Sequence, residues 1–340
     1  MTIKNLCAES LDTTNQNRIS AFEAGFRYPL SMTENFSISH GADYSLFYRS
    51  MGESLVLAAE QGELPIATVA ATIRELKIPS GKIHRCAYIG DLKYNKSVSA
   101  SRKLLSLLLE LQNWCVQKAD SAIAIVMGGT QNLPDSYSGR LGLKEMKQLG
   151  TMQIYRIPVR SAESSRQFRQ AERIDGTIAD CFIETSPRNF ICFKPNSAVD
   201  IDPESTSDIG AIWLGTADTV DSNISTGGGA IGCLQDTRKA KKLFREDGSE
   251  ILNAHLTNFY YQDIESAASI IESSLALARQ NSFEALFLSL DNERSHELSR
   301  LLQNLGATRS EAIIYGIGVI ADANDINNSN RNWCINSSEV

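Results

Sequence analysis

The chain has 340 residues, of which 42% are apolar and 21% charged, so it is long enough for two globular domains and too apolar for a disordered or fibrous protein. Its 40 acidic residues outnumber the 33 Lys and Arg, and the net charge of -7 argues against nucleic acid or an anionic membrane as the main partner. No secretion signal opens the sequence and no apolar run approaches the ~18 residues that span a bilayer, which predicts a cytoplasmic protein.

The first elements are two helical patterns and a β-meander. Helical spacing covers residues 13–27 and 42–51, and a polar loop joins the two segments. Residues 53–94 contain three β-patterned runs that are separated by Gly62 and by the turn at 79–81. This order predicts three antiparallel strands after two helices.

A long helix and a buried strand are predicted next. Apolar residues recur at helical spacing on one face, at Leu104, Leu105, Leu108, Leu111 and Cys115. The run SAIAIVMGG is a short apolar stretch that ends in glycines, as strands covered on both faces do. A short helix (LPDSYSGRLG) and two strand-like runs ending at IYRIPV follow.

The second half repeats this order of elements. Strand patterns occur in IGAIWLGTA, GGGAIGCLQDTRKAKKLF and ILNAHLTNFYY, before the amphipathic helix ESAASIIESSLALARQN. A buried strand (EALFLSLDN), a helix ending in LLQNLG and the strand EAIIYGIGV complete it. From Ala321 onward the Asn- and Ser-rich sequence has little to bury and is expected to be loose.

A serine-rich run lies between the meander and the long helix. It reads Lys96, Ser97, Val98, Ser99, Ala100, Ser101 and Arg102. Free N–H groups and the positive dipole end of a helix N-terminus bind pyrophosphate, and the small serine side chain adds a hydroxyl donor. With the order of elements around it, the run resembles the phosphate loop of the GNAT superfamily of acetyl-CoA-dependent N-acyltransferases. Serine stands where that loop has two glycines.

Two further signals resemble the same superfamily. After the strand SAIAIVMGG, Asn132, Tyr137 and Gly142 resemble the asparagine, tyrosine-bearing helix and glycine turn of its members. The tyrosine lies five residues before the glycine instead of four, and Ser138 takes the four-residue place. The second half repeats the strand, Asn, helix and glycine layout at 292–306, with Leu302 in the tyrosine place.

The resemblance implies an α+β (α/β) protein with two tandem GNAT-like domains, each a mixed, mostly antiparallel sheet flanked by helices. It divides the chain into a catalytic domain at 1–159, a linker at 160–177, a degenerate domain at 178–320 and a polar tail at 321–340. The run NFYYQDIESAAS has no glycine and carries two acids where the second phosphate loop would lie, which indicates a lost cofactor site.

The implied activity is the transfer of an acetyl group from acetyl-CoA to a primary amine. In the superfamily the pantetheine pairs with the exposed edge of the fourth strand, where Gly90 predicts a bulge. The oxyanion would accept a backbone N–H near Leu92 or Lys93. Asp91 is the candidate general base, with Glu34 and Glu75 as competitors, or is a carboxylate paired with Lys93. Tyr137 is the candidate acid for the leaving thiolate, or a half-buried structural tyrosine.

The predicted acetyl-CoA contacts are Leu92, Lys93, Tyr94, Lys96, Ser97, Val98, Ser99, Ala100, Ser101, Arg102 and Asn132. No metal is expected, because the four histidines fall in no H-E-x-x-H or H-x-H spacing and the seven cysteines contain no C-x-x-C pair. The acceptor and the oligomeric state stay open. The alternative to an enzyme is a non-catalytic acyl-CoA sensor or scaffold, which the missing glycines and displaced tyrosine favour.

Overall fold

The computed structural model describes residues 2–7, 13–29, 34–95, 102–130, 134, 139, 141–159, 169–171, 190–194, 212–215, 229–318, 320 and 332–340. The chain forms two compact units, and each is built from separate stretches of the sequence. Unit 1 comprises Met1–Gly150, Ala240–Ser249 and Ala312–Asn330, and unit 2 comprises Thr151–Lys239, Glu250–Glu311 and Arg331–Val340. No helix in these described stretches is long and apolar enough to cross a membrane.

The sheet of unit 1 has the strand order β1-β4-β5-β6-β7-β16. Its strands are β1 (Thr2–Asn5), β4 (Ser54–Gln61), β5 (Leu64–Lys77), β6 (Ile83–Tyr94), β7 (Ser121–Met127) and β16 (Thr308–Gly318). Strands β4, β5 and β6 pair antiparallel in sequence order, so the predicted meander is confirmed. Strand β7 joins β6 in parallel, because helix α3 (Arg102–Lys118) carries the chain back across the sheet.

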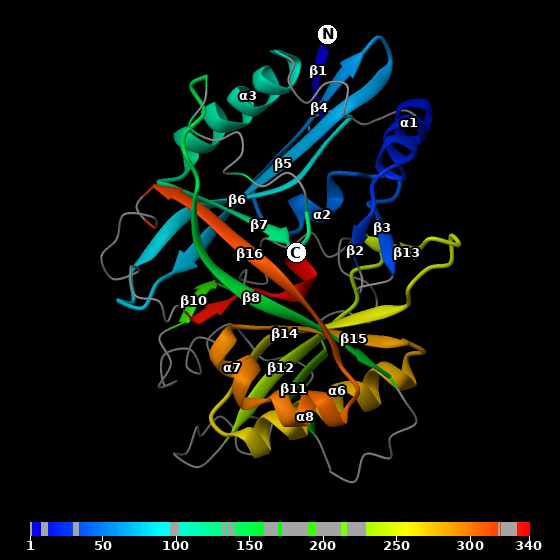
Figure 1. Ribbon diagram of the computed structural model, residues 1–340, viewed down its shortest axis with the longest axis vertical. Coiled ribbons are helices and arrows are strands. Elements are labelled where there is room, and N and C mark those ends of the chain that lie inside the picture. The colour runs from blue at the N-terminus through cyan, green and yellow to red at the C-terminus, as the bar shows by residue number, and fades with distance from the viewer. Residues whose placement is uncertain are drawn as a thin grey trace. The chain divides into compact units, whose positions relative to one another are not determined.

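Helix α3 covers one face of this sheet (Figure 1). Its buried residues are Leu104, Leu107, Leu111 and Cys115, at the spacing of one helical face, and the predicted helix is therefore confirmed. They share a core with alternate residues of β4, Leu55, Leu57 and Ala59. Because strand side chains alternate, Val56 and Ala58 of β4 point to the other face, and both are fully buried there.

The segments that cover this other face include α1 (Thr13–Glu23), which contacts β5, and α2 (Leu46–Arg49), which contacts β4 and β5. Both helices are shorter than the predicted 13–27 and 42–51. The expected loop between them contains two strands, β2 (Tyr28–Pro29) and β3 (Asn35–Ser39). Strand β3 pairs with β2 and with β13 (Lys242–Arg245), a partner that is distant in the sequence.

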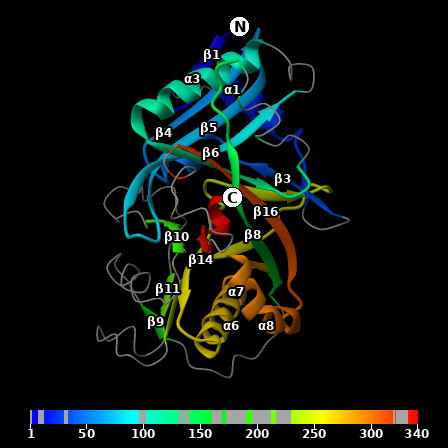
Figure 2. The ribbon, with the colours of Figure 1, turned by 60° about the vertical axis from the view of Figure 1, so that its left-hand side comes forward.

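The sheet of unit 2 has the order β8-β15-β14-β12-β11-β9. Its elements are β8 (Lys147–Pro158, in unit 2 from Thr151), β9 (Arg169–Ala171), β11 (Ile212–Gly215), β12 (Ala230–Gln235), β14 (Asn253–Tyr261) and β15 (Ala285–Leu290), with the helices α6 (Ile264–Gln280), α7 (Asn292–Glu297) and α8 (Ser299–Asn304). Helix α6 connects the parallel strands β14 and β15, as α3 connects β6 and β7 (Figure 2). The second half of the chain thus contains a β-α-β unit, as the first half does.

The last strands of the two halves are exchanged between the units. Residues Ala312–Gly318 of β16 pair antiparallel with β7 in unit 1. Residues Gln153–Pro158 of β8 pair with β15 in unit 2. Strand β8 is also a single strand, where two strand-like runs were predicted. A strand from the second half of the chain therefore completes the sheet of unit 1.

Two polar segments contain buried side chains. In the basic run 238–242, Lys241 is buried and its ammonium lies 4.4 Å from the centre of the Phe47 ring. The final residues were expected to be loose, but β17 (Asn332–Cys334) pairs with β10 (Phe190–Phe193), and the 3-10 helix η4 (Ser337–Glu339) follows. The Trp333 side chain is fully buried and supplies the apolar anchor that composition concealed.

A substitution of Gly318, at the end of β16, tests the close contact of this strand with the residues before β7. It has φ 85°, and a Cβ there would lie 2.3 Å from the Asp120 carbonyl oxygen. We expect Gly318→Ala to lower the free energy of unfolding by about 1–3 kcal/mol, from backbone strain plus a clash with backbone. Gly248→Ala is the matched control, because Gly248 has φ 83° and open space around its Cβ position. Equal losses in urea unfolding of the two variants would contradict the clash.

Candidate functional site

Strand β6 contains a β-bulge directly after Gly90. The register against β5 shifts there, so that Asp91 and Leu92 together stand opposite one residue of β5. Asp91 has φ 57°, in the left-handed region that few non-glycine residues adopt. Such bulges bend a strand and redirect its side chains, often beside functional sites. The bulge predicted from Gly90 is therefore confirmed, one residue further along the strand.

Gly90 has a close aromatic neighbour. A Cβ at this position would lie 3.3 Å from the hydroxyl oxygen of Tyr48, a residue of α2. The Tyr48 side chain is buried, and burial raises the pKa of its hydroxyl well above the ordinary value, so the phenol stays protonated. The bulge thus begins beside a neutral hydroxyl group.

The parallel ladder between β6 and β7 stops where the bulge starts. Its pairs run from Cys86 with Ser121 to Ile89 with Ala124, although both strands continue beyond them. On its other edge, β7 stays paired with β16 as far as Met127. The end of β6, residues 90–94, thus keeps its ladder with β5 while its pairing with β7 has ended.

An ion-paired network lies under the bulge. Lys93 contacts the Asp91 carboxylate, and its ammonium also donates to Glu23 Oε1 at 3.0 Å. The Tyr44 hydroxyl donates to the other Asp91 oxygen and lies 3.2 Å from Lys93 Nζ. The Thr68 hydroxyl donates to the Asp91 carbonyl at 3.3 Å. These contacts fix both the side chain and the backbone of the left-handed residue.

Glu23 and His40 form the second part of this network. Glu23 is the last residue of α1, and His40 directly follows β3. The His40 Nδ1 atom lies 2.6 Å from Glu23 Oε1, and the His40 backbone N–H donates to Glu23 Oε2 at 2.9 Å. The imidazole packs against Tyr44, with ring centres 4.8 Å apart. A carboxylate on Nδ1 fixes the ring orientation of this histidine.

Burial makes the electrostatics of the network strong. The side chains of Lys93, Glu23 and His40 are at most 2% exposed, and that of Asp91 is 5% exposed. Burial alone would raise the pKa of Asp91, but the nearby charges of Lys93 and His40 and the bonds from Lys93 and Tyr44 hold it below its ordinary value. The Glu23 pKa is likewise held low, against burial, chiefly by His40 and then Lys93.

The Lys93 pKa moves in the complementary direction. Burial lowers it, and the negative charges of Asp91 and Glu23 together with the bond to Asp91 outweigh that effect, so its net pKa is raised. Burial also raises the Tyr44 pKa well above the ordinary value and that of Tyr28 to about 12. Two carboxylates, an ammonium and neutral phenols therefore coexist at neutral pH.

Oxygen and nitrogen donors of Glu23, His40 and Asp91 lie within 4.8 Å of one another, which is close enough to hold a metal ion. Lys93 contacts both carboxylates of this group. A divalent cation would have to displace that ammonium, because both charges compete for the same oxygens. The donor set therefore fits an internal ion pair better than a metal centre.

Some of the predicted site residues lie in the described part of the chain, and the others lie outside it. Asp91, Leu92, Lys93 and Tyr94 lie together in β6, and Arg102 is the exposed first residue of α3. Leu92 and Tyr94 pack against the core under α3, whereas Asp91 and Lys93 enter the network on the other face. The others fall outside the described residues: Lys96, Ser97, Val98, Ser99, Ala100, Ser101, Asn132 and Tyr137. The competitors Glu34 and Glu75 are exposed.

The corresponding place in unit 2 is filled by protein groups. The Asp263 side chain caps α6 and accepts the Ser266 N–H at 2.8 Å, which occupies a donor that an anion would use. Leu302, in the tyrosine place, is buried in the core of this unit. The loss of a cofactor site from the second half stays a prediction.

Sequence reasoning missed Glu23 and Tyr44, and it treated His40 as an ordinary structural residue. The sequence held one signal for Glu23, because it follows the apolar Ile19 by four residues and therefore shares its face of the helix. The structure shows that both residues are buried. No sequence signal joins Glu23 to Lys93, because 70 residues separate them.

No protein-family model matches the sequence, and none of the curated proteins does. Solved structures do resemble it. A Saccharomyces cerevisiae N-myristoyltransferase with bound myristoyl-CoA has a TM-score of 0.58 at 10% identity, covering 93% of this chain and 82% of that one. The chain has a GNAT-like fold. A second structure of that transferase scores 0.57 at 10% identity, over 93% of this chain and 79% of the other.

A lower score, 0.46 at 11% identity, relates the chain to a GCN5-related N-acetyltransferase from Anabaena variabilis, with coverage of 92% and 72%. The likeness to the two transferase structures, with TM-scores above 0.5, establishes the fold and leaves the chemistry to the site. The predicted fold class is therefore confirmed.

Proposed function

We propose that the protein is an N-acyltransferase that moves an acyl group, acetyl in the simplest case, from an acyl-CoA to a primary amine. The observation that carries the proposal is the bulge at Asp91 and Leu92, at the point where the β6–β7 ladder ends. An extended pantetheine with two amides can pair with a strand edge as an added strand. Helix α3 then starts eight residues after Tyr94, and its N-terminus suits the pyrophosphate.

The reaction forms a C–N bond and breaks the C–S bond of the thioester. The amine must lose a proton, the carbonyl oxygen must be stabilised as an oxyanion, and the thiolate must leave. Backbone N–H groups of Leu92 or Lys93 are the proposed oxyanion donors, and Tyr137 is the proposed acid for the thiolate. With an ordinary thiol pKa near ~8.5, thiolate departure needs little assistance.

Asp91 is proposed to act chiefly as a positioning residue, with direct proton acceptance as the alternative role. Its carboxylate is occupied by Lys93 and Tyr44, and its low pKa makes it a weak acceptor for an amine proton. The same contacts hold its left-handed backbone, and thereby the direction of the neighbouring N–H groups.

The second candidate function is an acyl-CoA sensor without catalysis. The serines at 99 and 101 and the displaced Tyr137 favour it, because they depart from the phosphate loop and acid position of the superfamily. Both functions require acyl-CoA binding, and only the transferase releases free thiol.

Ligand binding and thiol release test the proposal in sequence. We expect acetyl-CoA, at a concentration 100 times its Kd, to raise the free energy of unfolding by ~2.7 kcal/mol, and desulfo-CoA to stabilise as well. A series from acetyl-CoA to myristoyl-CoA defines the acyl length. Absence of any heat of binding with every CoA species would overturn both functions.

Thiol release is then measured against amines, amino acids and polyamines. We expect release with at least one acceptor, and we expect Tyr137→Phe to slow turnover while leaving the Kd for acyl-CoA unchanged. Binding without release across the whole set would favour the sensor over the transferase.

A further inference from the structure

Two cysteines that form no disulfide stand side by side in unit 2, far from the bulge in sequence and outside the proposed chemistry. Cys192 on β10 and Cys334 on β17 are partners in a parallel strand pair, after Phe190 with Asn332 and Ile191 with Trp333. Both thiols are reduced in the structure. They are separated by 141 residues of chain, so only the tertiary fold brings them together.

The register meets the geometric requirement of a disulfide. Neighbouring strands lie about 4.8 Å apart, and disulfides join Cα atoms roughly 4.4–6.8 Å apart. Partners in a register also point to the same face of the sheet. Cys192 shares its face with Phe190, whose ring lies 5.8 Å from that of Tyr260 on β14.

The surroundings confirm that both sulfur atoms point the same way. Electrostatic interactions connect the Tyr260 hydroxyl to both Cys192 and Cys334, and a hydrogen bond joins it to the Cys334 sulfur. Arg294 on α7 interacts electrostatically with Cys334, and its guanidinium lies 4.9 Å from the centre of the Phe190 ring. Both sulfur atoms therefore face the same group of buried side chains.

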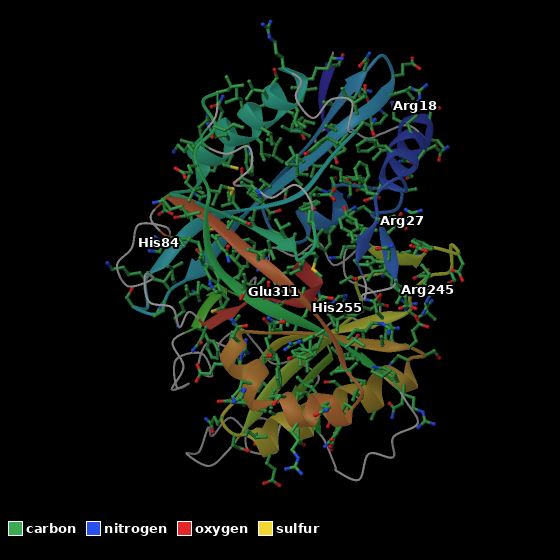
Figure 3. All side chains as sticks on the ribbon, viewed as in Figure 1. Arg18, Arg27, His84, Arg245, His255 and Glu311 are labelled. Carbon is green, nitrogen blue, oxygen red and sulfur yellow. The ribbon has the colours of Figure 1, made fainter. Side chains whose placement is uncertain are left out.

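Access differs between the two thiols. Cys192 is fully buried, whereas Cys334 is half-buried. An oxidant therefore reaches Cys334 first, and the buried Cys192 is the resolving thiol that reacts with the oxidised Cys334. Strand β17 is also secured next to this pair, because the Asn336 side chain accepts the Asn258 N–H at 2.8 Å and Ser337 bonds to His255 at 3.0 Å (His255 is labelled in Figure 3).

We propose that Cys192 and Cys334 form a redox-active dithiol that a hydroperoxide oxidises to a disulfide, which fastens the C-terminal strand to β10. The Cys334 thiolate attacks the peroxide, the O–O bond breaks, and a sulfenic acid and one water (or alcohol) result. The Cys192 sulfur then displaces hydroxide, which leaves as a second water after protonation. Two thiols are oxidised and one peroxide is reduced. A dithiol reductant reverses the step.

The test uses the intact chain and hydrogen peroxide as the probe. Wild-type protein is treated at pH 8, blocked with a maleimide under denaturing conditions, and analysed by mass and by peptide mapping. We expect a loss of two of the seven thiols and a cross-linked peptide pair containing Cys192 and Cys334. Dithiothreitol should restore all seven.

Single variants supply the controls. Cys192→Ser and Cys334→Ser should each abolish the cross-link, and Cys334→Ser should also remove the sulfenic acid that dimedone traps in Cys192→Ser. Cys7→Ser, at a half-buried cysteine of unit 1, should leave the cross-link unchanged. A cross-link to any other cysteine, or seven free thiols in wild type after treatment that oxidises the denatured chain, overturns the proposal. Acyl-CoA binding and thiol release do not enter these readouts.

Discussion

Lys93→Met is expected to destabilise the protein by about 3–5 kcal/mol, the largest loss foreseen for a single substitution here. Methionine matches the length of the lysine stem but removes the ammonium. Glu23 and Asp91 then stay buried as two carboxylates without their shared counter-ion. A typical domain is stable by 5–15 kcal/mol, so this loss is a large part of the total and is measured by urea unfolding at pH 7.

Lys118→Met is the matched control for this experiment. Lys118 also pairs with a carboxylate, Glu53, but its side chain is 31% exposed and that of Glu53 is 53% exposed. Exposed pairs contribute about 0–1 kcal/mol, so the control should change stability little. A combined Lys93→Met, Asp91→Asn, Glu23→Gln variant should regain part of the loss. Similar losses for Lys93→Met and Lys118→Met would refute the buried network.

The second large effect is a fall in stability at acid pH that depends on the same carboxyls. The folded pKa values of Glu23 and Asp91 lie below the values of 4.5 and 3.8 expected for the unfolded chain. Between the folded and the unfolded pKa values the unfolded state binds more protons, so stability rises with pH there. The contribution of the two carboxyls is complete above about pH 4.5. It is lost as the pH falls through the folded pKa values.

Lys93 sets the alkaline limit of the stability that the network contributes. Its folded pKa is raised above the ordinary 10.5, so its contribution is present below pH 10.5 and is lost as the pH rises through the folded value. We therefore expect a plateau of stability between roughly pH 5 and 10 from this network.

The measurement is the urea midpoint from pH 2.5 to 7. Asp91→Asn should be less stable than wild type at pH 7, and the difference should shrink below pH 3.8 as the wild-type carboxyl becomes protonated. Glu63→Gln is the control, because Glu63 is 77% exposed and pairs only with Arg18 among the described residues (Arg18 is labelled in Figure 3). A pH-independent difference between Asp91→Asn and wild type would show that Asp91 is not ionised in the folded protein.

Why a buried ion-paired network lies at this bulge follows from geometry. A buried ion pair is a weak source of stability compared with apolar packing, and it can instead specify one arrangement of the groups around it. Here it joins α1, the residue after β3, and β6 to the left-handed backbone of Asp91. Under the proposed function, that specificity is used to aim backbone donors at the thioester.

Local pattern determined most elements of this chain. Alternation predicted β4, β5 and β6, helical spacing predicted α3 and α6, and Gly90 indicated the bulge, because these features depend on neighbours a few residues away. Average composition was a poor guide to burial in two polar segments. Trp333 is one buried residue in a polar tail, and Lys241 is one buried cation in a basic run, so averages over the segments concealed them.

Only the tertiary structure decided which distant segments meet. Periodicity shows that β16 and β8 have an apolar face, but their exchange between the two units depends on pairing with strands that are distant in the sequence. The same holds for Glu23 with Lys93 and for Cys192 with Cys334. A carboxylate or a thiol acquires its chemistry from partners and burial, and neither is encoded within a local window of sequence.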